Sequence, residues 1–299
     1  MNNSHTVDFS IIIPTCNRPQ ELSRCLDRLR PEAQTNGLLD SPVDSPGGTR
    51  TGHPFTYEII ISDDGQESKI EKSIVSSRPW TQWKKGPRKG PAANRNNGAR
   101  AARGNWLVFL DDDCLPKPDL LDAYWQCILQ SPDSLVIEGR IEPEGPKRYL
   151  REVAPINLTG GYLWSCNFAI QRNFYWNQLN GFCEEFQYPC MEDVDLRARI
   201  INLKTLILFC ADAKVVHPWR IHARKFLKEF QMRKESTFLF YRRHPELKPK
   251  FITSIRIWIQ QSARDFISIL RSPNILDTVY FLKQRSIKLI IILLLVNSL

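Results

Sequence analysis

Residues 105–116, NWLVFLDDDCLP, carry the pattern on which the fold prediction rests. The mostly apolar run from Trp106 to Leu110 is followed at once by three aspartates, Asp111 to Asp113. A short apolar run of this kind predicts a buried strand. Three adjacent carboxylates repel one another, and a hard divalent cation relieves that repulsion because it prefers oxygen ligands. The alternative is that these aspartates cap a helix or lie in a solvated loop.

Strands and helices alternate through the first 110 residues. The predicted strands are residues 9–13, 57–61 and 106–110, and the predicted helices are residues 19–29, 67–76 and 92–104. This alternation predicts an α/β fold with a mostly parallel sheet flanked by helices. Ligands of such sheets bind beyond the carboxyl ends of the strands. We therefore expect residues 14–18, 62–65 and 111–113 to meet in one pocket.

The composition is that of a globular protein with an excess of positive charge. The chain has 299 residues, of which 42% are hydrophobic, and a formal net charge of +9. Eight Lys or Arg and no acid lie between Arg78 and Arg103, and ten Lys or Arg against three acids lie between His217 and Phe251. Each run suggests a phosphate-bearing ligand, a membrane surface or nucleic acid, or else a solvated basic face.

The cysteines and the N-terminus favour a reducing compartment. The eight cysteines are scattered without a C-x-x-C pair, which argues against both a disulfide framework and a zinc finger. The first ten residues, MNNSHTVDFS, are polar and lack the apolar core of a secretory signal. We expect a cytoplasmic location.

Two regions differ in character from the predicted sheet. Residues 31–56 are rich in Pro, Gly, Ser and Thr without periodicity, which predicts a flexible surface insertion. Residues 221–299 are expected to form a helical, basic and apolar C-terminal region. Its apolar residues recur at helical spacing at Ile252, Ile255, Ile259, Ala263, Phe266 and Leu270. The apolar end, residues 289–299, is too short for a bilayer span of about 20 residues. This region either packs as core or lies peripherally on the cytosolic face of a membrane.

A second acidic cluster lies in the segment MEDVDLRARI, residues 191–200. Leu196 and Ile200 are spaced as on one helix face, so Glu192 and Asp193 fall in a first helical turn. One interpretation is that the helix dipole favours acids there. The other is that one carboxylate is a general base, which accepts a proton from a reacting hydroxyl.

Four segments together resemble the family 2 inverting glycosyltransferases with the GT-A fold. They are FSIIIPTCNRPQEL, YEIIISDDGQES, AANRNNGARAARGNWLVFLDDDCLPKPDLL and SCNFAIQRNFYWNQLNGFCEEFQYPCMEDVDLRARI. The resemblance covers roughly residues 9 to 220, in the family's order and spacing. It implies a GT-A domain over residues 1–220, a nucleoside diphosphate sugar donor that is usually UDP-linked, and a Mn²⁺ or Mg²⁺ cofactor.

The resemblance also implies roles for individual residues. It places a metal on Asp113, the ribose on Asp111 and the proton-accepting base at Asp193, with Glu192 orienting the site or the acceptor. The residues that it implies for the nucleotide and the donor include Pro14, Thr15, Arg18, Asp64 and Asp112.

Four further residues are candidates with ordinary alternatives. Arg95 adds a donor for phosphates or nucleotide, or is an exposed helix arginine. Gly161, beside Gly160, permits close approach of the backbone to the donor sugar, or is a turn residue. Trp164 stacks on a sugar or belongs to the core. His217 lies where many relatives place a metal or diphosphate ligand, or is a structural histidine.

The leading hypothesis is a metal-dependent transfer of one sugar to a hydroxyl of a glycan or a lipid-linked acceptor. The processive synthases of this family carry a Q-x-x-R-W motif, whereas residues 231–235 read QMRKE, which favours single addition. A sugar nucleotidyltransferase is one alternative, but it needs a Gly-rich phosphate loop and PTCNRP contains no glycine. A nucleotide or nucleic-acid binding module is the other. It leaves the acidic clusters unexplained, because acids repel a phosphate backbone, and we expect no nucleic-acid partner.

Overall fold

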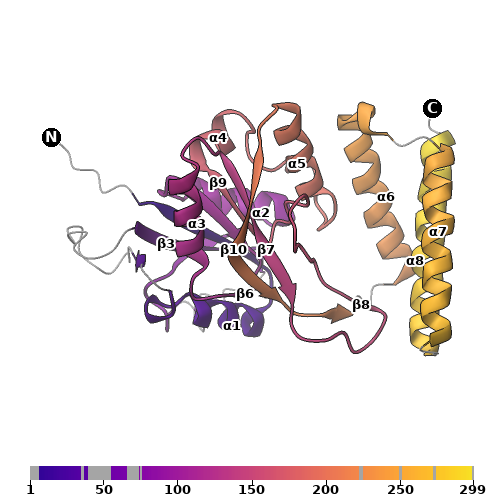
Figure 1. Ribbon diagram of the computed structural model, residues 1–299, viewed down its shortest axis with the longest axis horizontal. Coiled ribbons are helices and arrows are strands. Elements are labelled where there is room, and N and C mark those ends of the chain that lie inside the picture. Colours follow the sequence, from indigo (N-terminus) through magenta and orange to yellow (C-terminus); the bar gives the residue numbers. More distant parts are fainter. Residues whose placement is uncertain are drawn as a thin grey trace. The chain divides into compact units, whose positions relative to one another are not determined.

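The computed structural model describes residues 7–34, 37–39, 55–65, 74, 76–221, 225–248, 251–271 and 274–297. The chain forms two compact units (Figure 1). The larger unit contains residues 1–144 and 155–218, and the smaller unit contains residues 145–154 and 219–299. The segment 145–154 is a part of the smaller unit that the sequence did not predict.

The larger unit is built on one sheet with the strand order β2-β3-β1-β5-β9-β7-β10-β6, and β4 pairs with β3 off this path. The bounds are β1 Phe9–Thr15, β2 Gly37–Leu39, β3 Phe55–Asp63, β4 Gln82–Lys85, β5 Trp106–Leu110, β6 Leu115–Pro116, β7 Val136–Pro143, β9 Asn167–Gln171 and β10 Ile207–His217. Most neighbours are parallel, while β9 is antiparallel to both β5 and β7 and β6 is antiparallel to β10. The predicted α/β class with a mostly parallel sheet is confirmed.

The central strands are buried on both faces, as their continuous apolar runs predict. Thr15 at the end of β1 is in register with Asp63 at the end of β3, so the carboxyl ends of these strands are level. The antiparallel β9 begins where β5 ends, because Leu110 pairs with Asn167. This pairing brings the segment before Asn167 to the same edge as the three aspartates.

Helices cover both faces of this sheet. The apolar residues of α1 (Pro19–Leu29) and α3 (Leu120–Gln130) share one core with Phe9, Ile11 and Ile13 of β1. On the opposite face lies α2 (Pro91–Arg100), whose Gly98 contacts Ile12: a Cβ on Gly98 would lie 2.7 Å from Ile12 Cγ2. The unit is completed by η1 Pro31–Ala33, α4 Arg172–Asn177 and α5 Glu192–Asn202.

The smaller unit is mainly helical. Its elements are β8 Glu152–Val153, β11 Arg220–Ile221, α6 Phe226–Arg243, η3 Pro245–Leu247, α7 Phe251–Arg271 and α8 Ile275–Asn297. The strands β8 and β11 pair antiparallel. The apolar run at residues 289–296 is the end of the longer helix α8. None of the helices in the described ranges combines the length and the apolar content that crossing a bilayer requires.

Part of the stretch predicted as a flexible insertion, residues 31–56, is ordered into the sheet. Strand β2 pairs with the start of β3 in parallel, from Gly37 opposite Phe55 to Leu39 opposite Tyr57. The three residues of β2 show no periodic pattern and lie in a Pro- and Gly-rich segment, so the sequence did not predict a strand there. Pairing with β3 makes them one. Residues 40–54, and nearly all of the predicted helix 67–76, lie outside the described residues.

Candidate functional site

The ends of β1 and β5 are joined by direct contacts of their polar side chains. Asp112 accepts hydrogen bonds from Thr15 Oγ1 (2.8 Å) and Arg18 Nη1 (2.6 Å), and Arg18 Nη2 lies 3.0 Å from Asp113 Oδ2. Asp112 and Asp113 are both buried. The predicted convergence of the two loops is therefore observed, and Arg18 offsets part of the negative charge of the aspartates.

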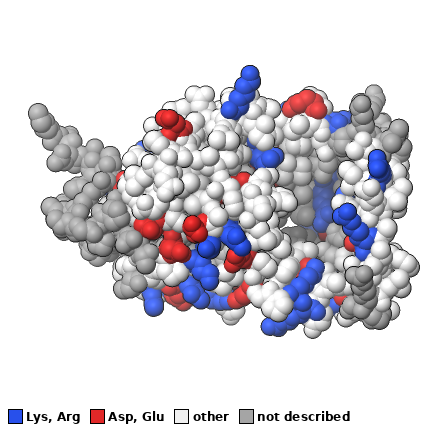
Figure 2. Space-filling model, viewed as in Figure 1, with Lys and Arg blue, Asp and Glu red and all other residues white. Residues whose placement is uncertain are grey.

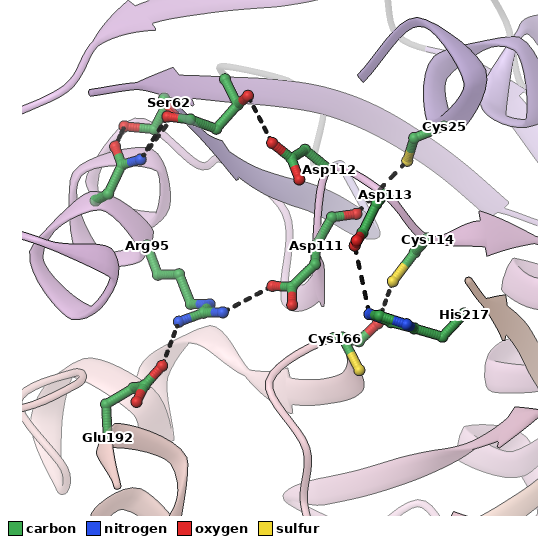
Figure 3. Close-up of polar contacts among 12 residues, drawn as sticks. Cys25, Ser62, Arg95, Asp111, Asp112, Asp113, Cys114, Cys166, Glu192 and His217 are labelled. Carbon is green, nitrogen blue, oxygen red and sulfur yellow. Dashed lines mark hydrogen bonds and ion pairs between the residues drawn. The ribbon is translucent and has the colours of Figure 1, made fainter. Parts of the chain in front are cut away.

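Asp113 also faces His217, which follows it by 104 residues in sequence. Strand β6, two residues after Asp113, pairs antiparallel with β10, and this pairing brings the end of β10 alongside. His217 Nε2 lies 3.4 Å from Asp113 Oδ1 (Figure 3). His217 Nδ1 lies 2.9 Å from the carbonyl oxygen of Pro218, so Nδ1 carries the proton that it donates there.

This pair suits a hard divalent cation. Burial lowers the pKa of His217, which favours the neutral ring with its Nε2 lone pair directed at Asp113. His217 Nε2 and Asp113 Oδ1 thus face each other with a lone pair each. A cation bound by both atoms would remove the repulsion between them. Cys114 Sγ lies in the same group of possible ligands, within 4.8 Å of the others. Its thiol donates to the carbonyl of Cys166, and burial raises its pKa well above the usual value, so it is a weak ligand.

Arg95 connects the two acidic clusters. From α2 it donates through Nη2 to Asp111 Oδ1 (2.7 Å) and through Nη1 to Glu192 Oε1 (3.1 Å) (Figure 3). Its side chain is 5% exposed, which excludes the exposed helix arginine that the sequence left open. Asp111 belongs to the end of β5 and Glu192 to the start of α5. The residue thus holds β5 and α5 at a fixed separation.

The first turn of α5 places two adjacent carboxylates in a buried position. Met191, just before the helix, has a φ of 73°, a left-handed conformation that is uncommon for a side chain of this type. Asp193 accepts from the backbone N–H of Val194 (2.8 Å) and of Ser165. Burial and the neighbouring Asp193 raise the pKa of Glu192 to about 7, and burial raises the pKa of Asp193 as well. This pair accordingly retains a proton at higher pH than isolated carboxyls.

The segment before β9 is held by a glutamate that the sequence reading did not identify. Glu138 of β7 is buried and accepts hydrogen bonds from the backbone N–H groups of Gly161, Tyr162 (3.1 Å) and Leu163 (2.8 Å). Gly161 has a φ of 99°, which explains why glycine is suited to this position. The sequence signal was an acid in the middle of the apolar strand VIEGRI.

Trp164 is half-buried and packs against the central core. Its ring stacks on Tyr162 with 5.8 Å between the centroids, and Nε1 donates to the carbonyl of Ile156. Tyr162 is largely exposed. The backbone N–H of the next residue, Ser165, donates to Asp193, so the aromatic pair directly precedes a residue that contacts the acidic cluster.

The candidates at the end of β3 interact mainly with backbone. Asp64 accepts from the N–H of Arg88 (2.7 Å) and of Gly90, and its own N–H donates to the carbonyl of Thr15. Pro14 is a buried member of β1 and pairs with Ser62. A residue missed by sequence reasoning, Asn94, donates to the carbonyls of Thr15 (3.2 Å) and Ser62 (3.0 Å) and so braces β1 against β3. No local pattern distinguished it from the other asparagines of α2.

Sequence comparison identifies a family for this architecture. Residues 10–186 match the model of glycosyl transferase family 2. A relative from Haemophilus influenzae, named as an uncharacterized glycosyltransferase, is 31% identical over 125 residues. The match covers 42% of this chain and 36% of that protein, so the chain spans well under two thirds of the relative's own length.

Solved structures with low sequence identity share the fold. GalNAc-T7 with UDP, GalNAc and Mn²⁺ is 17% identical with a TM-score of 0.55, covering 79% of this chain and 48% of that one. The mannosyltransferase PcManGT from Pyrobaculum calidifontis, with GDP-Man and Mn²⁺, is 14% identical with a TM-score of 0.52, covering 82% and 66%. The predicted GT-A fold is confirmed.

Proposed function

Because this chain belongs to glycosyl transferase family 2, we propose that it transfers a sugar from a nucleoside diphosphate sugar to an acceptor hydroxyl, with inversion at the anomeric carbon. The observation that carries this proposal is the Arg95 bridge. It couples Asp111, which adjoins the Asp113–His217 pair, to the carboxylates of α5. A chain of direct contacts thus links a set of metal-type ligands to a pair of carboxylates suited to proton transfer.

Asp113 and His217 would hold Mn²⁺ or Mg²⁺. When bound, such a cation offsets the negative charge that develops on the departing diphosphate. The ligand types support this assignment, since a carboxylate oxygen and an imidazole nitrogen suit Mn²⁺. GalNAc-T7 with UDP, GalNAc and Mn²⁺, and PcManGT with GDP-Man and Mn²⁺, share this fold and are consistent with the assignment.

Asp193 is the proposed base. As the acceptor oxygen bonds to the anomeric carbon, its proton passes to the Asp193 carboxylate, and the bond from the anomeric carbon to the diphosphate oxygen breaks. Backbone N–H groups of Ser165 and Val194 orient this carboxylate. The raised pKa of Asp193 suits a proton acceptor, because a more basic carboxylate takes the proton more readily. Glu192, fixed by Arg95, is the proposed orienting group.

The donor contacts are proposed at the edge formed by β1, β3 and β5. Thr15, Arg18 and Asp64 would face a nucleobase, for which we propose uracil, and Asp111 would face the ribose. The remaining proposed contacts are Pro14, Arg95, Asp112, Gly161 and Trp164. Arg18 already compensates Asp112 and Asp113, so it is placed to adjust its pairing when a diphosphate enters.

The acceptor and the setting are also proposals. We propose a single addition to a glycan or lipid-linked acceptor, in the cytoplasm or at the cytosolic face of a membrane, as one step in the synthesis of a polysaccharide or glycolipid. The larger unit, with the GT-A fold, would perform the transfer. The smaller helical unit would not take part in the chemical step.

The test measures UDP affinity with and without Mn²⁺ by calorimetry. We expect Asp113→Asn to weaken the Mn²⁺-dependent part of the affinity at least about tenfold, because an amide is a poorer ligand than a carboxylate. Asp212→Asn is the matched control, since Asp212 lies on β10 with a side chain that is 81% exposed. Unchanged Mn²⁺-dependent affinity in Asp113→Asn would refute the metal assignment. Turnover of nucleotide sugars in the wild type, with product stereochemistry, then identifies the donor.

A further inference from the structure

Helix α7 packs with its polar side inward. Its Gln261 accepts hydrogen bonds from Arg285 (2.9 Å) and Lys288 (2.6 Å) of α8, and its Asp265 forms an ion pair with the same Arg285. Trp258 Nε1 donates to the carbonyl of Arg285. The interface between α7 and α8 is therefore largely hydrogen bonds and charge, whereas the contact face of a helix in a globular protein is usually apolar.

The part of the apolar stripe of α7 from Ile259 to Leu270, formed by Ile259, Ala263, Phe266 and Leu270, is exposed instead. Ile259, Phe266 and Leu270 are 55%, 62% and 65% exposed. Helix α8 repeats the pattern in its first half, where Ile275, Val279 and Leu282 are exposed. Rows of exposed apolar side chains at helical spacing indicate a surface that contacts something apolar.

The positive charge of the protein is concentrated in the same unit. Residues 145–154 and 219–299 contain 19 of the 41 Lys and Arg but six of the 32 Asp and Glu. The excess of +13 exceeds the net charge of the whole chain, so the rest of the protein is slightly acidic. On the face drawn in Figure 2, Lys and Arg appear at several places on this unit with few acids between them. The unit is therefore attracted to anionic surfaces.

A cavity of about 440 Å³ lies among these basic residues. Lys147, Arg233, Arg285 and Lys288 line it, together with one acid, Asp265. This volume is in the range of small-ligand sites.

The charges around the cavity are incompletely balanced. Asp265 pairs with Arg285, and Glu229 with Arg233. Among the described residues, Lys288 donates to the Gln261 amide and Lys147 lies over the ring of Trp219, and neither ammonium is within 4.0 Å of a carboxylate. Burial, followed by the repulsion of Arg285 and Arg233, lowers the pKa of Lys288. An anion in the cavity would relieve that repulsion.

We propose that this cavity binds the phosphate group of an anionic membrane lipid, while the exposed apolar side chains of α7 and α8 enter the lipid layer. Lys147 and Lys288 supply charged donors to the phosphate oxygens. The apolar stripe supplies the area that a lipid surface covers, and the net charge of the unit supplies long-range attraction. The proposal goes beyond sugar transfer and is tested without donor or metal, so either can fail while the other holds.

The experiment is co-sedimentation of the full chain with vesicles of phosphatidylcholine, or of phosphatidylcholine and phosphatidylglycerol in equal amounts. The wild type should bind the mixed vesicles and bind the neutral ones weakly. The double variant Lys147→Gln/Lys288→Gln removes the two cations that line the cavity and form no ion pair with any described carboxylate. Its matched control, Arg256→Gln/Arg264→Gln, removes two exposed cations of α7 that do not line the cavity.

We expect the lysine variant to lose at least about tenfold more vesicle affinity than the control, because hydrogen bonds from charged groups to a phosphate add to diffuse attraction. Equal losses would mean that attraction is diffuse and would overturn the cavity assignment. Phe266→Ser/Leu270→Ser should weaken binding to the mixed vesicles, and unchanged binding would overturn the insertion of the stripe.

Two measurements with soluble phosphate compounds complete the test. Glycerol 3-phosphate should compete with mixed vesicles more strongly than chloride at equal ionic strength, and equal competition would overturn the phosphate site. Calorimetric titration with inorganic phosphate distinguishes the source of the phosphate. Binding of inorganic phosphate that depends on Lys147 and Lys288, without any vesicle binding, would overturn the lipid in favour of a free phosphate ligand.

Discussion

Replacing Arg95 with methionine removes the guanidinium that joins the two acidic clusters but keeps most of the side-chain volume. Arg95 and Glu192 have side chains that are 5% and 6% exposed, so water cannot replace the lost contact. Removing one partner of a buried ion pair typically costs about 3–5 kcal/mol. We expect a loss in this range in the free energy of unfolding at pH 8, where Glu192 is ionised in the wild type.

The pH dependence separates charge from packing. Glu192 has a pKa of about 7 in the folded protein, raised from 4.5, and the unfolded chain releases this proton earlier. The folded wild type thus loses stability as the pH rises from 4.5 through 7. Without Arg95 the folded pKa of Glu192 rises further, so the variant loses still more stability as the pH rises beyond 7. At pH 5 Glu192 is protonated in both folded proteins, and the difference between them should be smaller.

The assay is urea unfolding followed by tryptophan fluorescence at pH 5 and pH 8. Arg100→Met is the matched control on α2, since Arg100 and Glu184 form an exposed pair, and it should cost less than about 1 kcal/mol. Arg95→Met/Glu192→Gln should recover much of the stability at pH 8, because no buried charge remains at position 192. Equal destabilisation by Arg95→Met at both pH values, or a double variant no more stable than Arg95→Met, would refute the reasoning.

Three further predictions concern the pocket. Asp193→Asn should retain UDP affinity but slow transfer at saturating substrates by ~10²- to 10⁴-fold, because an amide cannot accept the proton. In the wild type, kcat/KM should fall as the pH is lowered below about 7. The pKa of Glu192 is raised to about 7 and that of Asp193 is raised as well, so the coupled pair takes up a proton in this range and the base loses its charge. Glu138→Gln should cost about 1–3 kcal/mol in unfolding free energy and raise the KM for the donor, because the amide satisfies fewer of the N–H groups at residues 161–163.

Each of these three predictions would be contradicted by a specific result. Weak UDP binding with normal turnover at saturation in Asp193→Asn would make Asp193 a binding residue. A kcat/KM that stays flat from pH 5 to pH 8 would exclude the carboxylate pair from the proton transfer. A Glu138→Gln protein with unchanged stability and KM would show that the loop does not depend on its anchor.

The sequence by itself determined the elements with strong local patterns. Helix α1 was predicted at residues 19–29 and strand β5 at residues 106–110, and both have these bounds in the structure. Apolar spacing with a period of 3.6 or 2 is a local property, so a single chain reveals it. The meeting of residues 14–18 with 111–113 also followed from sequence, because parallel strands end at one edge.

The tertiary structure decided which of these groups touch. His217 reaches Asp113 because the two-residue strand β6 pairs with β10, and no pattern in the 103 intervening residues encodes that pairing. In the sequence, Glu138 is only an acid that interrupts an apolar strand. In the structure it accepts hydrogen bonds from the N–H groups of residues 161–163, which come from a loop distant in sequence. The stripe of α7 was visible in the sequence, but periodicity shows that a helix has an apolar face and does not show which face is covered. That depends on partners distant in sequence, and here the polar face of α7 is the one that packs.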